Sequence, residues 1–391
     1  MMASLSKVDR YFAVQWLSAI GFGVLLFVII WLAPEILMDV TQAVTDGKLS
    51  VVQGVMALLY HVPEILLTAI PMAALLGSVF VVQRLCQQNE LVAILSSGIS
   101  ARRLIVPAVA VSLVFSVFYA LVQEVWQPAA FSAKTLLYVT HDLQGKSSDP
   151  FLFLDRTHRG ERAPRWFFMA GEIPLTAKEP FAQVVMLTYA PSTQGVGTEI
   201  QSIIQAKSAR ILNASGLWQL QDGVEYHMRS DGGYEASDTF LKKTVHLSPA
   251  VNALAQFHRK NPMALNMLDL QAYVGLLKAT HQGQDQRFFS VRLLQKWLNP
   301  LTPVLFVILG ALIGLEPPRS WRATALTVTA GVLFLYGVSV PFSVNLGSLG
   351  VLPIWMAAVL PQLLAMALTG LSIGLLRNTQ GYLGQGFWGK A

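Results

Sequence analysis

The sequence predicts an α-helical membrane protein with six transmembrane helices and a β domain inserted between the third and the fourth. The first observation is composition: 53% of the residues are hydrophobic, only 13% are charged, and the mean hydropathy is +0.50, far from an average soluble domain. The second is a set of apolar runs of about 20 residues, the length that spans a bilayer. The third is the central stretch, where short aromatic and β-branched runs alternate with turn signals.

Three of the apolar runs precede the central stretch and three follow it. The predicted spans are residues 12–33, 63–83, 104–125, 298–315, 323–344 and 351–376. Lysine and arginine in the short connections are concentrated on one side: Lys7, Arg10, Arg84, Arg102, Arg103, Arg319, Arg322, Arg377 and Lys390, against Lys48 alone on the other. The positive-inside rule therefore predicts that both termini and the 84–103 connection are cytoplasmic and that the central stretch is not.

The connection 84–103 contains a short helical pattern between two spans. Asn89 can cap a helix whose first turn carries Glu90, where the helix dipole favours an acid. Leu91, Ile94 and Leu95 follow at helical spacing as one apolar stripe. Two interpretations remain open: an amphipathic turn resting on lipid headgroups, or a docking helix for a soluble partner with Glu90 as its polar contact.

The central stretch is predicted to form successive strands of a sandwich or open-barrel domain. Runs begin at Phe151, Arg165, Ala182, Ser202, Gly216 and Val224, and Asp222-Gly223 is predicted to be a two-residue hairpin turn between the last two. An amphipathic helical pattern starts at Leu268. The predicted organisation is residues 1–125 with a cytoplasmic helix at about 87–98, a β domain at 126–262, a helical connector at 263–297, and spans with a cytoplasmic tail at 298–391.

No catalytic or cofactor motif is present. The sequence has no Walker A or dinucleotide fingerprint, so ATP, if it drives this protein, must bind to another chain. Seven scattered histidines and one cysteine, Cys86, predict no metal site. Basic residues are not interleaved with aromatics, which excludes nucleic acid as a partner. We predict neither catalytic residues nor a bound cofactor.

Acidic residues lie near the outer ends of the first three spans, at Glu35, Glu64 and Glu124. The span centres lack ionisable residues, which disfavours a proton relay. The three glutamates are either solvated in the headgroup region or part of a lateral gate. Lys134, just beyond the third span, is either a lipid-phosphate contact or an ordinary surface lysine.

Small residues in the later spans permit close helix approach. They are Gly310, Ala311 and Gly314 in the fourth span, and Gly370 and Gly374 in the sixth. They serve either packing within the chain or contact with a second transmembrane subunit.

Several segments, in order along nearly the whole chain, resemble the LptF/LptG family of lipopolysaccharide-export permeases, somewhat closer to LptG. They are VDRY at Val8, PEILLTAIPMAALLGSVFVVQRL at Pro63, ELVAILSSGIS at Glu90, QAKSARIL at Gln205 with GLWQL, LDLQAYVGLL at Leu268, Lys296 before NPLTP, and LPIWMAAVLPQLL at Leu352.

The resemblance implies two six-span subunits, different or identical, around a lateral cavity, each with a periplasmic β-jellyroll. It also implies a cytoplasmic LptB-like ATPase dimer that uses ATP-Mg, and an LptC/LptA-like periplasmic bridge protein. The implied ATPase-coupling residues are Glu90, Leu91, Ile94, Leu95, Arg102 and Arg103. Glu35 stands where some relatives carry a basic residue, and Lys134 matches their basic residues after the third span only approximately.

The sequence therefore predicts the permease subunit of an ATP-driven exporter in the bacterial inner membrane. Its cargo would be lipopolysaccharide or a related large glycolipid. The alternatives are an ion-gradient-driven carrier of amphiphiles and a membrane-anchored lipid-binding scaffold that transports nothing.

Overall fold

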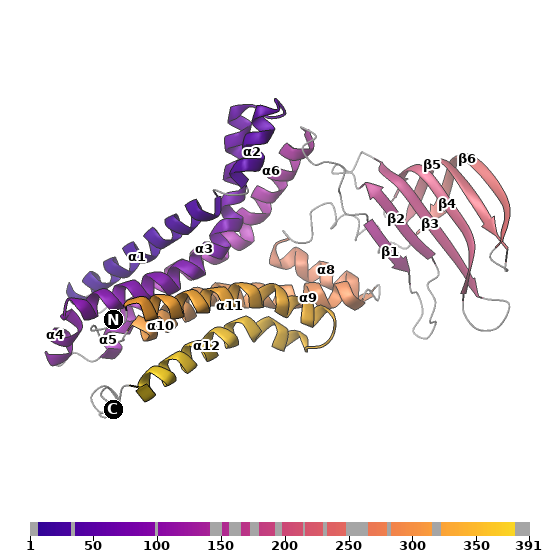
Figure 1. Cartoon of the computed structure of the whole chain (residues 1–391). Helices are drawn as coiled ribbons and strands as arrows, with labels where there is room; N and C mark the ends of the chain where they lie inside the picture. Colours follow the sequence, from indigo (N-terminus) through magenta and orange to yellow (C-terminus); the bar gives the residue numbers. More distant parts are fainter. Residues whose placement is uncertain are drawn as a thin grey trace, which may run out of the picture. The chain divides into compact units, whose positions relative to one another are not determined.

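The chain forms two compact units, one helical and one built on a β-sheet. The structure, a computed structural model, describes residues 7–32, 36–97, 101–140, 151–155, 166–172, 180–191, 198–213, 216–229, 233–247, 265–279, 283–314 and 322–379 (Figure 1). The first unit comprises Met1–Lys134 and Ser290–Ala391, and the second comprises Thr135–Phe289. The inserted domain thus interrupts one continuous helical unit.

The helices follow the apolar runs of the sequence. They are α1 Lys7–Leu32, α2 Ile36–Thr45, α3 Val51–Gln87, α4 Glu90–Ser96, α5 Ala101–Leu121, the π-helix η1 Val122–Trp126, α6 Gln127–Thr140, α8 Met267–Ala279, α9 Gly283–Leu298, the 3₁₀ turn η3 Asn299–Leu301, α10 Thr302–Gly314, α11 Arg322–Ser348 and α12 Ile354–Thr379.

Six segments of the described residues are long and apolar enough to cross a membrane, as the sequence predicts. They are Asp9–Leu32, Val51–Gln87, Val106–Thr135, Gly283–Gly314, Ala325–Ser348 and Ile354–Leu371. The prediction of six spans with an inserted β domain is confirmed.

Helix α3 begins well before the predicted start of the second span. The Ser50 side chain accepts a hydrogen bond from the Gln53 backbone nitrogen, and the Gln53 side chain accepts one from the Ser50 nitrogen, which is a capping box. Pro63 and Pro71 lie inside the helix without ending it. Prolines are tolerated in membrane helices because neighbouring groups satisfy the freed carbonyls.

Helix α3 is the centre of the helical unit. It packs against both α1 and α10, and 78% of its apolar window is buried, against 17% for α1. A Cβ atom on Gly310 would lie 2.5 Å from the carbonyl oxygen of Leu75, and one on Gly314 would lie 2.8 Å from Val82 Cβ. These two glycines therefore serve packing within the chain, whereas a Cβ on Gly370 would meet nothing within 4 Å.

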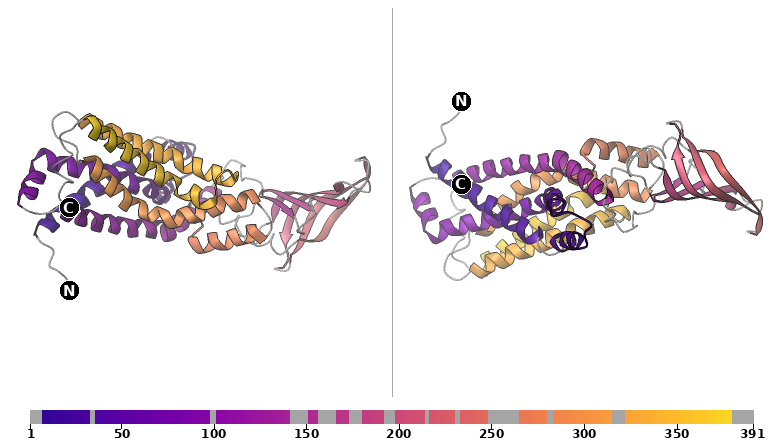
Figure 2. Two further views of the ribbon diagram at one scale, coloured as in Figure 1. Left: turned by 90° about the horizontal axis from the view of Figure 1, so that it is seen from below. Right: turned by 90° about the horizontal axis from the view of Figure 1, so that it is seen from above.

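The described strands of the second unit form one antiparallel sheet (Figure 2), in which sequence neighbours are also spatial neighbours (Figure 1). The strands are β1 Phe151–Asp155, β2 Trp166–Glu172, β3 Phe181–Pro191, β4 Thr198–Ile211, β5 Leu217–Met228 and β6 Tyr234–His246. Four begin within one residue of a predicted run, β4 begins four residues before its run, and β6 was not predicted. Its burial pattern explains why: nearly all its residues are exposed, so no clear apolar alternation marks it.

The predicted hairpin turn at Asp222-Gly223 is wrong. Both residues lie inside β5, which continues from Leu217 to Met228. Asp222 does adopt the left-handed backbone that such a turn requires, with φ of 51°. The chain uses this conformation for an irregularity within a strand, and the two predicted strands are therefore one.

The irregularity at Asp222 belongs to a row that crosses the sheet from β2 to β6. In each of these five strands, one residue is left out of the ladder of paired positions. These residues are Gly171, Gln183, Lys207, Asp222 and Leu241. Gln183 also has a positive φ, 52°. In a regular strand, the residues that face one side are two positions apart. Where β3 and β4 cross this row, the buried residues are instead three positions apart: Phe181 and Val184 in β3, and Ala206 and Ala209 in β4. The irregularity thus shifts the side-chain alternation in step and keeps the apolar residues on one face.

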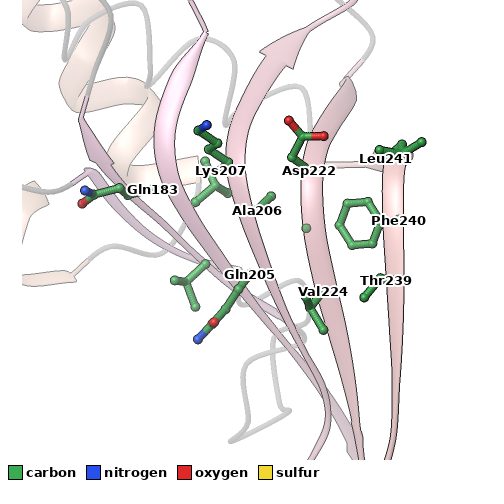
Figure 3. Close-up of a pocket in the computed structure, with 12 residues that line it drawn as sticks. Gln183, Gln205, Ala206, Lys207, Asp222, Val224, Thr239, Phe240 and Leu241 are labelled. Atoms are coloured by element: carbon green, nitrogen blue, oxygen red, sulfur yellow. The ribbon is translucent and has the colours of Figure 1, made fainter.

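A groove of about 670 Å³ follows this row (Figure 3). Its lining comes from β3, β4, β5 and β6 and includes Gln183, Lys207, Asp222 and Leu241. Gly223 lies in its floor, where a Cβ atom would be 2.4 Å from Phe240 Cζ and 2.5 Å from the Gln205 carbonyl oxygen. Only glycine fits this position.

Candidate functional site

The short helix α4 follows α3 after a two-residue turn. Asn89 adopts φ of 56°, a left-handed conformation that asparagine tolerates well, and its carbonyl oxygen accepts the first hydrogen bond of α4 from the Ala93 nitrogen at 3.0 Å. The turn therefore begins α4 at Glu90.

Glu90 is half-buried and bonded to the first span. The Tyr11 hydroxyl of α1 donates to both carboxylate oxygens, at 3.3 Å to Oε1 and 3.2 Å to Oε2. The neighbouring Leu91 is only 6% exposed and belongs to the same buried cluster as Phe12 and Leu85. Leu91 therefore anchors α4 to the helical unit in this structure.

The other predicted coupling residues are described by their backbone alone. Ile94 and Leu95 lie in α4, and Arg102 and Arg103 lie in the first turns of α5. Their side chains lie outside the described residues. The part of the predicted site that the structure describes in full is thus Glu90 and Leu91.

A second polar group lies where α5 passes through the π-helix η1. The Lys296 ammonium nitrogen of α9 is 3.4 Å from Glu124 Oε1. The buried Gln123 side chain donates to the Lys296 carbonyl oxygen at 3.1 Å and to Glu124 Oε1 at 3.2 Å. Lys296 and Glu124 expose 12% and 29% of their side chains. Two side-chain bonds therefore link η1 to α9 in a largely buried setting, and a third joins Gln123 to Glu124 within η1.

A proline accounts for the π-helix that carries Glu124. Pro128 has no N–H to donate to the Glu124 carbonyl oxygen four residues earlier, and its ring clashes with that group. The Gln127 nitrogen bonds instead to the Val122 carbonyl oxygen, five residues earlier. Such one-turn π segments are frequent at functional sites.

The Glu124 and Lys296 pair lies near one edge of the apolar layer. At about 1.5 Å per residue, both residues are about 27 Å along their spans from the ends at Val106 and Gly314. The hydrocarbon layer is about 30 Å thick. By length and composition, the pair therefore lies toward the far end of both spans.

Glu64 and Lys134, both predicted as candidate lipid contacts, are electrostatic neighbours. His61, one helical turn before Glu64, is close to both, and its ring bonds to the Ala57 carbonyl oxygen at 2.8 Å. Glu35, the remaining predicted residue, lies outside the described residues. Sequence reasoning missed His61 and the role of Lys296 as the partner of Glu124. The i, i+3 spacing of His61 and Glu64 was an available signal for the first.

One face of the sheet changes from apolar to charged across the strands. Phe168, Met186 and Ile204 are buried cross-strand partners in one row, and the next residue of that row is Glu225. Glu225 forms an ion pair with Lys243 of β6. This face is therefore apolar and buried over β2 to β4 and polar over β5 and β6.

Aromatic contacts stabilise the apolar part of this sheet. The Trp218 ring is fully buried, and its centroid lies 5.0 Å from those of both Phe168 and Phe181. Such pairs contribute about 0.5–1.5 kcal/mol each beyond their buried area. No cluster of three metal-ligating side chains occurs within the described residues.

The sequence model of the lipopolysaccharide export system permease LptF/LptG family matches residues 10–377. The match runs through all six apolar helices and the inserted sheet. A comparison with curated proteins gives no match.

Proposed function

The chain belongs to the lipopolysaccharide export system permease LptF/LptG family, and from this premise we propose that it is the transmembrane subunit of an ATP-driven exporter. The exporter takes lipopolysaccharide, or a related large glycolipid, out of the inner membrane and passes it along the β domain. The observation that carries this proposal is the unbroken match across both the spans and the sheet.

We assign ATP hydrolysis to a separate LptB-like dimer, because this sequence has no nucleotide-binding fingerprint. In the proposed orientation, the basic short connections place both termini and α4 in the cytoplasm and the sheet in the periplasm. Helix α4 then presents Glu90 to the ATPase, with Leu91 holding the helix on the membrane unit.

The proposed lipid contacts lie at the opposite ends of the spans. Lys296 and Lys134 are the cations there, each beside a carboxylate, Glu124 and Glu64 respectively. A lipid phosphate that enters between the helices can replace the carboxylate as the partner of either ammonium group. Glu124 and Glu64 therefore keep the lysines compensated while no lipid is bound.

The sheet supplies the proposed route beyond the membrane. Its row Phe168, Met186 and Ile204 is apolar and at most 3% exposed here, and we propose that acyl chains contact it when the sheet opens. Among the described strands, β6 pairs on one side only, so it can add a strand of a bridge protein of the LptC or LptA type.

A second permease subunit is part of the proposal because large apolar faces are uncovered in this chain. Phe22 of α1 and Phe334 and Phe342 of α11 are examples, each at least 59% exposed. Lipid covers part of such a surface, and a second subunit, identical or of the other family type, covers the rest.

The test is a pull-down of this chain from its native membranes in mild detergent, with protein and lipid identified by mass spectrometry. We expect an ABC-type ATPase subunit and a lipopolysaccharide-sized glycolipid. A chain that reproducibly came down alone would contradict the proposal and favour a carrier or a lipid-binding scaffold.

A further inference from the structure

The hydroxyl of Tyr11 and the carboxylate of Glu90 link two helices that are 79 positions apart in the sequence. The hydroxyl lies almost equally close to the two oxygens, at 3.2 and 3.3 Å. The Tyr11 ring is held in place by the buried Phe12 ring, which meets it edge-on with the ring centroids 5.6 Å apart. Tyr11 itself is 46% exposed, so the bond is at the surface of the helical unit.

Helix α4 depends on such contacts for its orientation. It has seven residues, and helices this short are unstable without tertiary support. The buried Leu91 fixes one side of its first turn. The bond from Tyr11 fixes the side chain of Glu90, which otherwise rotates about three bonds and would lose that freedom when a partner binds.

The bond leaves Glu90 able to accept further donors. A carboxylate has about four acceptor positions, and the phenol supplies one proton. The remaining positions are available to an ammonium or guanidinium group of a docked protein, which is the chemistry that recognises a carboxylate most strongly.

We infer that Tyr11 is a positioning residue for the coupling acid: it holds the Glu90 carboxylate in place for the partner's cation and ties the inner end of α1 to α4. The inference rests on the proposed function and deepens it. Displacement of α4 by the docked ATPase is then passed to α1 through this bond and through the packing of Leu91. α1 packs closely on α3, with Phe12 and Trp16 buried in the shared core, so a movement of α1 reaches the centre of the helical unit.

The test measures the affinity of the purified chain, reconstituted with its native partner subunits, for the ATPase recovered in the pull-down. Tyr11→Phe keeps the ring and removes the hydroxyl, and we expect affinity to fall about 3- to 10-fold, less than for loss of a direct hydrogen bond between a charged group and the partner, because the hydroxyl acts only by positioning Glu90. Glu90→Gln should weaken binding further. The double variant should bind no more weakly than Glu90→Gln alone, because the hydroxyl acts only through the carboxylate.

Tyr60→Phe is the matched control. Tyr60 is a half-buried tyrosine on α3, far along the helix from α4, and this variant should keep the original affinity.

Unchanged affinity of Tyr11→Phe, or additive losses in the double variant, would overturn the inference while leaving the docking role of Glu90 intact. Unchanged affinity of Glu90→Gln would overturn the docking role itself and the inference with it.

Discussion

The Lys296 ammonium nitrogen lies 3.4 Å from Glu124 Oε1, across 172 positions of sequence. The pair joins α9 to the π-helix η1, and Gln123 bonds to both of its members. The two opposite charges compensate each other, and both side chains are largely withdrawn from water.

Removing one member of this pair is expected to cost more than removing both. Glu124→Leu removes the carboxylate that pairs with the largely buried Lys296 and should destabilise the helical unit by about 1–3 kcal/mol. Lys296→Leu alone should have a similar effect. The double variant should recover much of the loss, which thermal unfolding in detergent will measure as a midpoint closer to the original. Two additive losses would show that the side chains act independently.

The close approach of α3 and α10 predicts opposite effects for two glycine substitutions. Gly310→Ala places a Cβ atom 2.5 Å from the Leu75 carbonyl oxygen, so the helices must separate, at a cost of about 1–3 kcal/mol. Gly331→Ala in α11 meets nothing within 4 Å and should be neutral or slightly stabilising. Thermal unfolding of the two variants side by side tests this. Equal stability would contradict the packing described for α10.

A charge reversal at Glu90 should detach the ATPase without unfolding the permease. Glu90→Lys places a like charge against the proposed cationic partner and should lower co-purification of the ATPase at least tenfold. Glu235→Lys makes the same change on the exposed strand β6 and should leave co-purification unchanged. Gel filtration checks that both variants remain intact. An ATPase that still co-purified fully with Glu90→Lys would exclude α4 as its docking element.

The two faces of the sheet should differ in lipid contact. A photoreactive amino acid at Met186, on the apolar face, is expected to form adducts with glycolipid in cells. The same residue at Gln205 is the control, because it is exposed and alternates with the buried Ile204 along β4. Gel mobility with antibody detection of the glycolipid reports the adducts. Equal labelling at both positions would rule out an apolar route along this face.

The spans and most strands were predictable because each carries its signal locally. Apolar runs of about 20 residues locate the spans, and runs such as the one at Ala182 locate a strand. Strand β6 carried no such signal, because its residues from Tyr234 onward are mostly exposed. The Asp222-Gly223 pair correctly indicated a left-handed backbone at Asp222, but it wrongly predicted a hairpin turn. Pairing with the neighbouring strand β4 continues on both sides of Asp222 and makes the segment one strand.

The candidate sites were predictable only as single residues. Glu90 and Glu124 could be singled out by their positions between and along apolar runs. Their partners, Tyr11 and Lys296, are 79 and 172 positions away and come near only through helix packing. Leu91 was predicted to belong to an apolar stripe that faces lipid headgroups or a soluble partner, and the structure buries it in the helical unit instead, since a seven-residue helix needs an anchor.

The row from Gly171 to Leu241 has an evolutionary consequence. Each of the five strands carries its irregularity at the same level, so the shift of side-chain alternation is shared. Deleting Gln183 alone would put one part of β3 one residue out of register with β2 and β4, which keep their own irregularities. An insertion or deletion at this level is therefore tolerated only when the adjacent strands change in the same way. The five positions should accordingly be kept, or lost, together during evolution.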